Sequence, residues 1–254
     1  ITVPVIGSLG IPWKLIHKDY RENEQFCDEQ VTGPFRSWKH IHRFIPHEGA
    51  SCLMRDEIYF EPLCGIPGLK WFISRELTRL FRYRHMVLTN DLALHARFKD
   101  KPRKTVLVSG SSGFIGSALC AFLSTAGHKV IRLVRRAPAH EGERPWDPES
   151  GMLDASVFDR VDVVIHLGGA GIADKRWSAD YKREILESRT KSAKLLCSVI
   201  AQLSNKPESV IMASATGYYG DTKDSLVEES ASIGKGFLAE TCQAWESSGR
   251  DALQ

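Results

Sequence analysis

The chain reads Gly110-Ser111-Ser112-Gly113-Phe114-Ile115-Gly116 where a predicted apolar strand, 104–109, gives way to a predicted helix, 117–126. A glycine pattern of this kind is informative when it lies between a strand and a helix, as it does here. Gly110 permits the tight turn, Gly113 lets the backbone approach a pyrophosphate, and Gly116 lets helix and strand pack closely. The helix N-terminus then offers unpaired N–H groups to phosphates. The stretch predicts a dinucleotide-binding turn; a glycine-rich turn that binds nothing is the alternative.

Strands and helices continue to alternate after this turn. Apolar strands without polar alternation are predicted at 130–134, 161–167 and 209–213, and a long helix at 178–203. Continuous apolar strands separated by helices indicate a parallel sheet covered on both faces. We therefore expect residues 104–254 to form an α/β, doubly wound Rossmann domain.

Two arginines, Arg135 and Arg136, follow the second strand of this domain. Arg135 lies 19 positions beyond Gly116, near the place where an NAD site carries an acidic residue for the ribose 2′-hydroxyl. A guanidinium suits a 2′-phosphate better than a free diol. The pair predicts NADP in preference to NAD, and a solvated basic strand end is the alternative.

The first part of the chain has a different pattern. Residues 37–44 alternate with period two, which places Trp38, His40, His42 and Phe44 on one face of a strand. A turn at Glu48-Gly49-Ala50 and a second strand over 52–60 complete a hairpin. A long amphipathic helix follows after Pro67-Gly68, with apolar residues at three- and four-residue steps.

These patterns divide the chain in two. Residues 1–95 are expected to form an α+β domain with an antiparallel sheet and one long helix. The polar segment 96–103, which contains Pro102, is expected to be a linker to the Rossmann domain of residues 104–254.

Composition excludes several classes of protein. Of the 254 residues, 43% are hydrophobic and 26% are charged, which is typical of a globular protein. The net charge of +3 does not favour a nucleic-acid partner, and no apolar run approaches the ~18 residues of a membrane span. The six cysteines include no C-x-x-C pair, so we expect reduced thiols and a cytoplasmic protein. The chain begins at Ile1 without a signal region, and we expect it to be part of a longer protein.

Three motifs together resemble the extended, atypical short-chain dehydrogenase/reductase superfamily. They are the turn at 110–116, His166-Leu167-Gly168-Gly169-Ala170, and Ala213-Ser214-Ala215-Thr216-Gly217-Tyr218-Tyr219-Gly220. More narrowly, Trp146-Asp147-Pro148, Lys175-Arg176-Trp177, Ser188-Arg189 and the segment 237–246 resemble nucleoside-diphosphate-sugar epimerase-like (SulA-type) proteins. The resemblance implies an NAD(P)-dependent epimerase or oxidoreductase acting on a sugar nucleotide or another small substrate with a hydroxyl or carbonyl group.

The turn, the arginines and the resemblance define the cofactor-binding residues that we expect. They are Gly110, Ser111, Ser112, Gly113, Phe114, Ile115, Gly116, Arg135, Arg136, Leu167, Gly168 and Gly169.

A second resemblance covers residues 1–95. Gly33-Pro34-Phe35, the alternating stretch 38–44 and Phe81-Arg82-Tyr83-Arg84 resemble the last strands and the helix of a START/polyketide-cyclase-like helix-grip domain. Such a domain has more N-terminal strands than the pattern reveals, so we expect it to be incomplete.

The catalytic residues are harder to predict. The superfamily generally uses a Tyr-x-x-x-Lys pair on a helix, where the Lys and the cofactor lower the Tyr pKa. Tyr219 and Lys223 have this spacing but lie in a predicted turn, and four-residue spacing gives a common face only in a helix. The helix that would carry the pair holds Phe237 and Thr241 instead.

The remaining catalytic candidates are Ser214, Thr216 and Tyr219, because they lie near a strand end that faces the nicotinamide in this fold. His40 and His42 share a strand face, but no third metal ligand is evident, so no metal is predicted. Without the usual pair, a protein that senses NADP(H) and binds a small ligand without turnover is the alternative to an enzyme. We also expect a homodimer through the helix at 178–203, because Ile185, Leu195, Leu196, Val199 and Leu203 give it apolar surface.

Overall fold

The computed structural model describes residues 2–6, 9–49 and 51–250. The chain divides into two compact units, Ile1–Leu88 and Thr89–Gln254. Helix α1 (Leu69–Ala96) begins in the first unit, and its last residues belong to the second. Among the described residues, no helix is both long enough and apolar enough to span a membrane.

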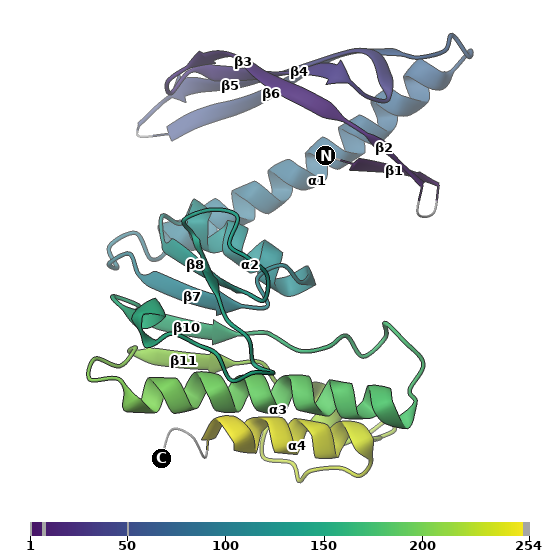
Figure 1. Cartoon of the computed structure of the whole chain (residues 1–254). Coiled ribbons are helices and arrows are strands. Elements are labelled where there is room, and N and C mark those ends of the chain that lie inside the picture. The colour runs from purple at the N-terminus through teal and green to yellow at the C-terminus, as the bar shows by residue number, and fades with distance from the viewer. Residues whose placement is uncertain (1, 7–8, 50, 251–254) are drawn as a thin grey trace. The chain divides into compact units, whose positions relative to one another are not determined.

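The second unit is the predicted α/β domain (Figure 1). A five-stranded parallel sheet has the order β11-β10-β7-β8-β9. Its elements are β7 (Thr105–Ser109), α2 (Phe114–Thr125), β8 (Lys129–Val134), β9 (Glu143–Pro145), η1 (Ala155–Phe158), β10 (Val163–His166), α3 (Ala179–Gln202), β11 (Ser209–Met212), η2 (Thr216–Tyr219) and α4 (Phe237–Arg250). The chain moves outward from β7 in one direction to β9 and in the other to β11. The strand order therefore reverses between β7 and β10, which is where ligands bind in open α/β sheets.

Two apolar clusters cover the two faces of this sheet. Successive residues of β7 point to opposite faces. Leu107 joins a cluster with Leu196 and Ile200 of α3, whereas Val106 and Val108 pack with Cys120 of α2. Continuous apolar strands are the consequence of burial on both sides.

The side chains that suggested a dimer take part in this packing. Ile185 and Leu196 are fully buried, and Leu195, Val199 and Leu203 pack against the core. Self-association through α3 stays a prediction, and it would have to use other side chains of that helix.

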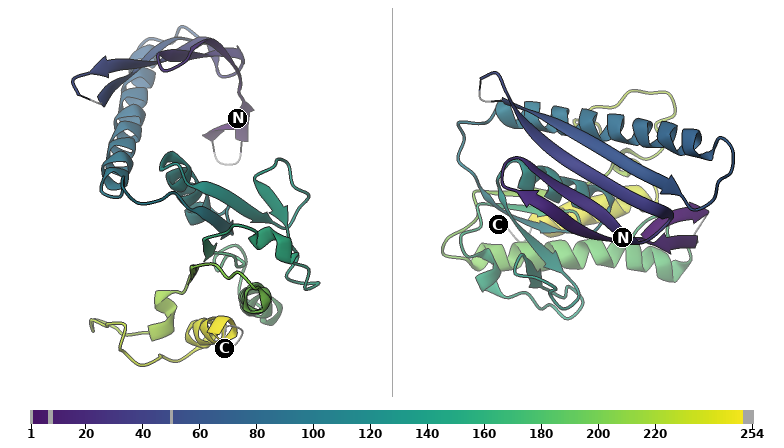
Figure 2. Two further views of the ribbon diagram at one scale, coloured as in Figure 1. Left: turned by 90° about the vertical axis from the view of Figure 1, so that its left-hand side faces the viewer. Right: turned by 90° about the horizontal axis from the view of Figure 1, so that it is seen from above.

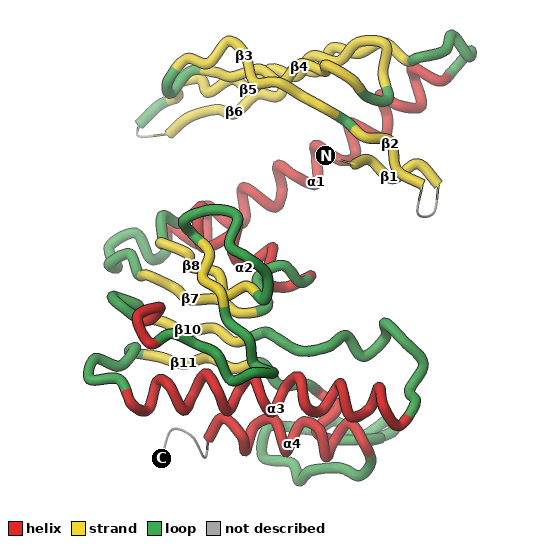
Figure 3. Tube along the Cα trace, viewed as in Figure 1, coloured by secondary structure: helices red, strands yellow, loops and turns green. Residues whose placement is uncertain are grey.

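The first unit contains an antiparallel sheet and most of the long helix (Figures 2 and 3). The sheet has the order β3-β4-β5-β6, and β1 pairs with β2 separately. The strands are β1 (Thr2–Ile6), β2 (Leu9–Pro12), β3 (Lys14–Arg21), β4 (Gln25–Thr32), β5 (Phe35–His47) and β6 (Ser51–Pro62). The predicted hairpin is β5 and β6, and the predicted turn lies between them, with Ala50 outside the described residues.

Sequence reasoning missed β3 and β4. Their alternation is obscured because charged residues occupy both strands, as in Lys14–Arg21. Opposite charges lie across the strands instead: Lys18 Nζ is 2.5 Å from Glu29 Oε2. A turn at Asn23, whose φ is +60°, joins the two strands.

Candidate functional site

The turn after β7 has a backbone that requires glycine at two positions. Gly110 has φ +70°, and a Cβ there would lie 2.7 Å from the carbonyl carbon of Leu167. A Cβ at Gly116 would collide with the carbonyl oxygen of Gly110. The turn is therefore packed so closely against β10 and α2 that no side chain fits at either position.

The same turn leaves the N-terminus of α2 open. Gly113 is the N-cap residue, and among the described residues no side chain caps the first turn of the helix with a hydrogen bond. Phe114 and Ile115 are 96% and 66% exposed, whereas Gly116 is buried. The backbone N–H groups of an uncapped helix N-terminus are donors for an anion such as a phosphate.

A cavity of about 740 Å³ lies at the carboxyl ends of β7, β8 and β10. Its lining includes all the predicted cofactor residues except Phe114, Ile115 and Gly116: Gly110, Ser111, Ser112, Gly113, Arg135, Arg136, Leu167, Gly168 and Gly169. Trp146, Ser188 and Ser192 also line it. The structure thus gathers three separate sequence motifs around one hollow.

The two arginines at the end of β8 differ in their partners. Arg136 forms a two-pronged ion pair with Glu143, with distances of 2.8 Å and 2.6 Å. This guanidinium, together with the N–H of Ala139, holds the pKa of Glu143 at about 2. Arg135 is exposed, and within the described part of the chain it has no hydrogen bond or ion pair. Arg135 is therefore free to bind an anion, whereas Arg136 is already engaged.

Two residues of α3 support the loop after β10. Ser188 Oγ accepts a hydrogen bond from the N–H of Ala170 at 3.0 Å, and Arg189 donates to the Ala170 carbonyl at 2.9 Å. A Cβ at Gly169 would lie 3.0 Å from Arg189 Cζ. These contacts fix the wall of the cavity formed by Gly168 and Gly169.

His166 is buried beneath this loop and is neutral. Ser192 Oγ donates to the Ser188 carbonyl at 2.6 Å, so it accepts from His166 Nε2 at 3.0 Å. Ser109 Oγ then donates to His166 Nδ1 at 2.5 Å. Burial lowers the pKa of His166 to about 4. The imidazole therefore links β7, β10 and α3 without carrying charge.

The catalytic candidates lie after β11, at the same edge of the sheet, and do not line the cavity. Ser214 Oγ donates to Glu246 Oε1 at 2.5 Å, which ties the strand end to α4. Thr216 and Tyr219 begin and end the short helix η2. Lys223 is exposed, with φ +50°, and its backbone N–H bonds to Asp221.

Two carboxylates were missing from the predicted site residues. Glu246 lies 32 residues along the chain from Ser214, so spacing could not pair them. Glu143 follows Arg136 by only seven residues, in the short strand β9, and the sequence pattern of Arg136 and Glu143 was overlooked. Glu246 was noted only within a segment that resembles the family, and its contact with Ser214 requires the fold.

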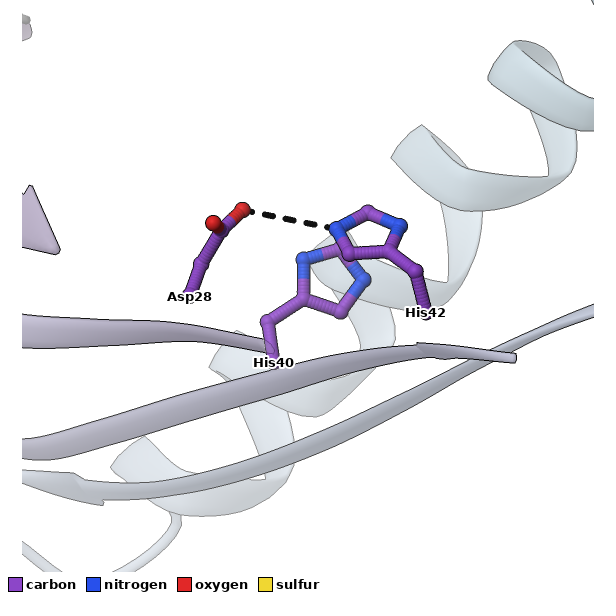
Figure 4. A group of neighbouring side chains, drawn as sticks. All are labelled: Asp28, His40 and His42. Carbon is purple, nitrogen blue, oxygen red and sulfur yellow. Dashed lines mark hydrogen bonds and ion pairs between the residues drawn. The ribbon is translucent and has the colours of Figure 1, made fainter. Parts of the chain in front are cut away.

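The first unit also holds a polar cluster that sequence reasoning did not complete. Asp28 lies beside His40 and His42 (Figure 4). Its carboxylate is the third side chain able to bind a metal ion, which was not evident from the sequence.

Comparisons with known proteins agree with this description of the second unit. The sequence model of the NAD dependent epimerase/dehydratase family matches residues 106–238, over half of the chain. "Epimerase family protein Mb2239" of Mycobacterium bovis is 46% identical over 149 residues, which are 59% of this chain and 49% of that protein. Human "Epimerase family protein SDR39U1" is 30% identical over 148 residues, which are 57% of this chain and 48% of that protein. The chain spans about half the length of the curated relatives it matches.

The solved structures that are similar to the chain include those of two named proteins. The nucleoside-diphosphate sugar epimerase of Corynebacterium glutamicum has a TM-score of 0.76 and 32% identity, and the match covers 96% of this chain and 52% of that one. Human SDR39U1 (isoform 2) with NADPH has a TM-score of 0.50 and 28% identity, and the match covers 57% of this chain and 48% of that one. The first match therefore extends over both units.

Proposed function

Because the chain belongs to the NAD dependent epimerase/dehydratase family, we propose that its second unit binds NADP(H) and acts on a small substrate with a hydroxyl or carbonyl group. A sugar nucleotide is the substrate class named for the similar structure from Corynebacterium glutamicum. The proposal keeps the cytoplasmic location expected from the cysteines.

One observation carries the cofactor proposal: an uncapped helix N-terminus and an unpaired arginine lie on the same cavity. The turn at 110–113 and the start of α2 would present backbone N–H groups to the pyrophosphate, and a Cβ at Gly110 would disrupt the close packing that shapes the turn. Arg135 would hold the 2′-phosphate, with Arg136 beside it. The similar human structure contains NADPH, which supports the same preference.

The residues after β11 would handle the substrate oxygen. When bound, the cofactor would accept or donate a hydride at the substrate carbon. Ser214, held by Glu246, would orient the reacting oxygen of the substrate. The Glu246 carboxylate would attract the hydroxyl proton of Ser214, which leaves Ser214 Oγ available as an acceptor. Tyr219 would exchange the proton with the substrate without help from Lys223.

Titration of the chain with NADPH and NADH tests the cofactor. Trp146 lines the cavity and is 4% exposed, so energy transfer from tryptophan to the reduced nicotinamide reports binding. We expect NADPH to bind at least about tenfold more tightly, because the 2′-phosphate adds charge-assisted hydrogen bonds. Equal affinities would contradict the NADP preference, and failure of both to bind would contradict the cofactor site.

A second function remains, in which the protein senses NADP(H) without turnover. It is favoured by α4, where Phe237 and Thr241 occupy the spacing of the usual Tyr/Lys pair and Thr241 is 4% exposed. Incubation with NADPH deuterated at C4 and an oxidised sugar nucleotide separates the two. Deuterium transfer to the sugar supports the enzyme, and tight NADPH binding without transfer supports the sensor.

A further inference from the structure

The first unit brings four titratable side chains to one face of its sheet. Asp28 on β4 lies directly opposite His40 on β5, and His42 lies directly opposite Asp56 on β6. Side chains two residues apart on a strand share a face, as do those directly opposite each other. The register alone therefore gathers two imidazoles between two carboxylates.

Three of these side chains converge. Asp28, His40 and His42 each offer one ligand atom, and the three atoms lie within 4.8 Å of one another. His42 Nε2 is 3.4 Å from Asp28 Oδ2, and Figure 4 shows both imidazoles turned toward the carboxylate. His40 and His42 are each only 5% exposed. Such a group is enclosed by protein and does not belong to the solvated surface.

Asp56 contacts the other ring nitrogens of both imidazoles. Its Oδ1 is 2.8 Å from His40 Nε2 and 2.9 Å from His42 Nδ1. Of these two contacts, only the one with His40 has hydrogen-bond geometry. A metal-binding histidine commonly turns its second nitrogen to a carboxylate, which fixes the tautomer and orients the ring, and Asp56 does this for His40. This arrangement leaves His40 Nδ1 and His42 Nε2 as the nitrogens available to a metal.

Two buried atoms of the cluster lack a hydrogen bond within the described residues: Asp28 Oδ1 and His42 Nδ1. Asp28 Oδ1 lies 2.6 Å from His17 Nδ1, and His42 Nδ1 lies 2.9 Å from Asp56, but neither contact has hydrogen-bond geometry. Buried polar atoms left unsatisfied are costly, and of these two only Asp28 Oδ1 lies on the side where the ligand atoms converge, where a cation would compensate the charge of the carboxylate.

We propose that Asp28, His40 and His42 bind a divalent transition-metal ion of the Zn²⁺ class, with Asp56 positioning the imidazole of His40. Imidazole nitrogen with one carboxylate suits Zn²⁺ and its first-row neighbours, whereas Ca²⁺ and Mg²⁺ prefer oxygen ligands alone. The ligand atoms would have to approach by about 1 Å for metal bonds of about 2.0–2.2 Å, which side-chain rotations supply.

A cavity adjoins the positioning residue Asp56 but is not lined by Asp28, His40 or His42, and the ligand set itself leaves a coordination position open. This cavity of about 530 Å³ between β6 and α1 is lined by Asp56 and His85, whose Nε2 is 2.5 Å from Asp56 Oδ2. Three protein ligands leave a position for water or a small ligand, as in catalytic zinc sites. The proposal concerns the first unit and does not depend on the NADP site.

The test measures Co²⁺ and Zn²⁺ binding to the whole chain. Cys52 and Cys64 are exposed thiols that could bind metal adventitiously, so the background carries Cys52→Ser and Cys64→Ser. We expect one Co²⁺ per chain, with visible d–d bands and no thiolate charge-transfer band, and displacement by Zn²⁺. Asp28→Asn and His42→Gln should each weaken binding at least about tenfold, and Asp56→Asn about 10- to 100-fold.

His47→Ala is the matched control, because His47 is an exposed histidine on the same strand. It should leave binding within about twofold, and circular dichroism should show that every variant keeps its secondary structure. If the His42 variant unfolds, a Zn²⁺-dependent rise in melting temperature that is present in the background and lost in Asp28→Asn supports the site. Absence of binding would overturn the proposal. Binding that is unchanged by Asp28→Asn and His42→Gln would also overturn it, and would identify the metal as adventitious only.

Discussion

At the residue scale, two adjacent arginines are expected to have different roles. Arg135→Ala should weaken NADPH binding about 10- to 100-fold with little effect on NADH, because it removes charge-assisted hydrogen bonds worth ~1–3 kcal/mol. Arg136→Ala should lower the melting temperature more than Arg135→Ala does, because Glu143 loses both of its hydrogen bonds to the Arg136 guanidinium. Nucleotide titration and thermal unfolding measure the two effects.

Arg183→Ala is the control, because Arg183 is an exposed arginine on α3 that pairs with Asp180. It should change neither measurement. Equal effects of the Arg135 and Arg136 variants on both measurements would contradict the distinction.

His166 should make stability depend on pH. Its pKa in the fold, about 4, lies below its ordinary value of 6.5, so the unfolded chain binds the proton more readily. The contribution of neutral His166 to the free energy of unfolding is complete above pH 6.5 and is lost as the pH falls toward 4. At 1.36 kcal/mol per pKa unit, the loss reaches about 3 kcal/mol.

The free energy of unfolding from denaturant titrations between pH 7.5 and 4 measures this dependence. His166→Gln, which does not titrate, should be less stable at pH 7 but should show a flatter profile. Parallel profiles for the two proteins would reject His166 as the source.

At the element scale, Tyr219 and Lys223 belong to different pieces of backbone. Tyr219 ends η2, and Gly220 then turns the chain with φ +67° before Lys223. If the protein is an enzyme, Lys223→Ala should leave kcat within a few-fold. Ser214→Ala or Tyr219→Phe should lower it about 10²- to 10⁴-fold, the usual scale for a group that transfers a proton.

Glu246→Gln extends this test to α4. It should lower kcat if the carboxylate draws the proton of Ser214, while NADPH affinity stays unchanged because Glu246 does not line the cavity. Loss of activity in Lys223→Ala as large as in Tyr219→Phe would restore a Tyr/Lys pair.

The elements also show why prediction succeeded in one unit and was incomplete in the other. β7, β8 and β10 are short, mainly apolar runs because both faces of their part of the sheet are covered, and such runs are visible in sequence. The edge strand β11 has the same composition, although Ile211 on one of its faces is exposed. β3 is exposed along most of its length, and its charges hide any alternation. Once β4 was missed, Asp28 could not be placed opposite His40, so the third possible metal ligand was missed with it.

The candidate site shows the same contrast. The glycines that the phosphate-binding turn needs all lie within the consecutive residues 110–116, so the position of the turn could be predicted. Glu246, the partner of Ser214, lies 32 residues further along the chain and is brought near by the packing of α4, which no local pattern encodes.

At the scale of the whole molecule, the segment 97–103 should be the first place where a protease cuts. Trypsin sites at Arg97, Lys99 and Arg103 are exposed and follow the end of α1 at Ala96. Arg79 and Arg82 are exposed as well, but they lie within α1, so they are an internal control with the same chemistry and a helical backbone. A protease needs a locally extended backbone, and unfolding a helix to provide one costs more than bending a loop.

Brief digestion followed by mass spectrometry should therefore give two fragments that meet within 97–103. Each fragment should then resist further cutting for longer than the segment itself, because each contains one of the two main sheets. Early cleavage at Arg79 or Arg82 would place the weak point inside α1. Early cleavage at Lys129 or Arg132, with 97–103 intact, would show that the parallel sheet opens first and would contradict the division of the chain into two domains.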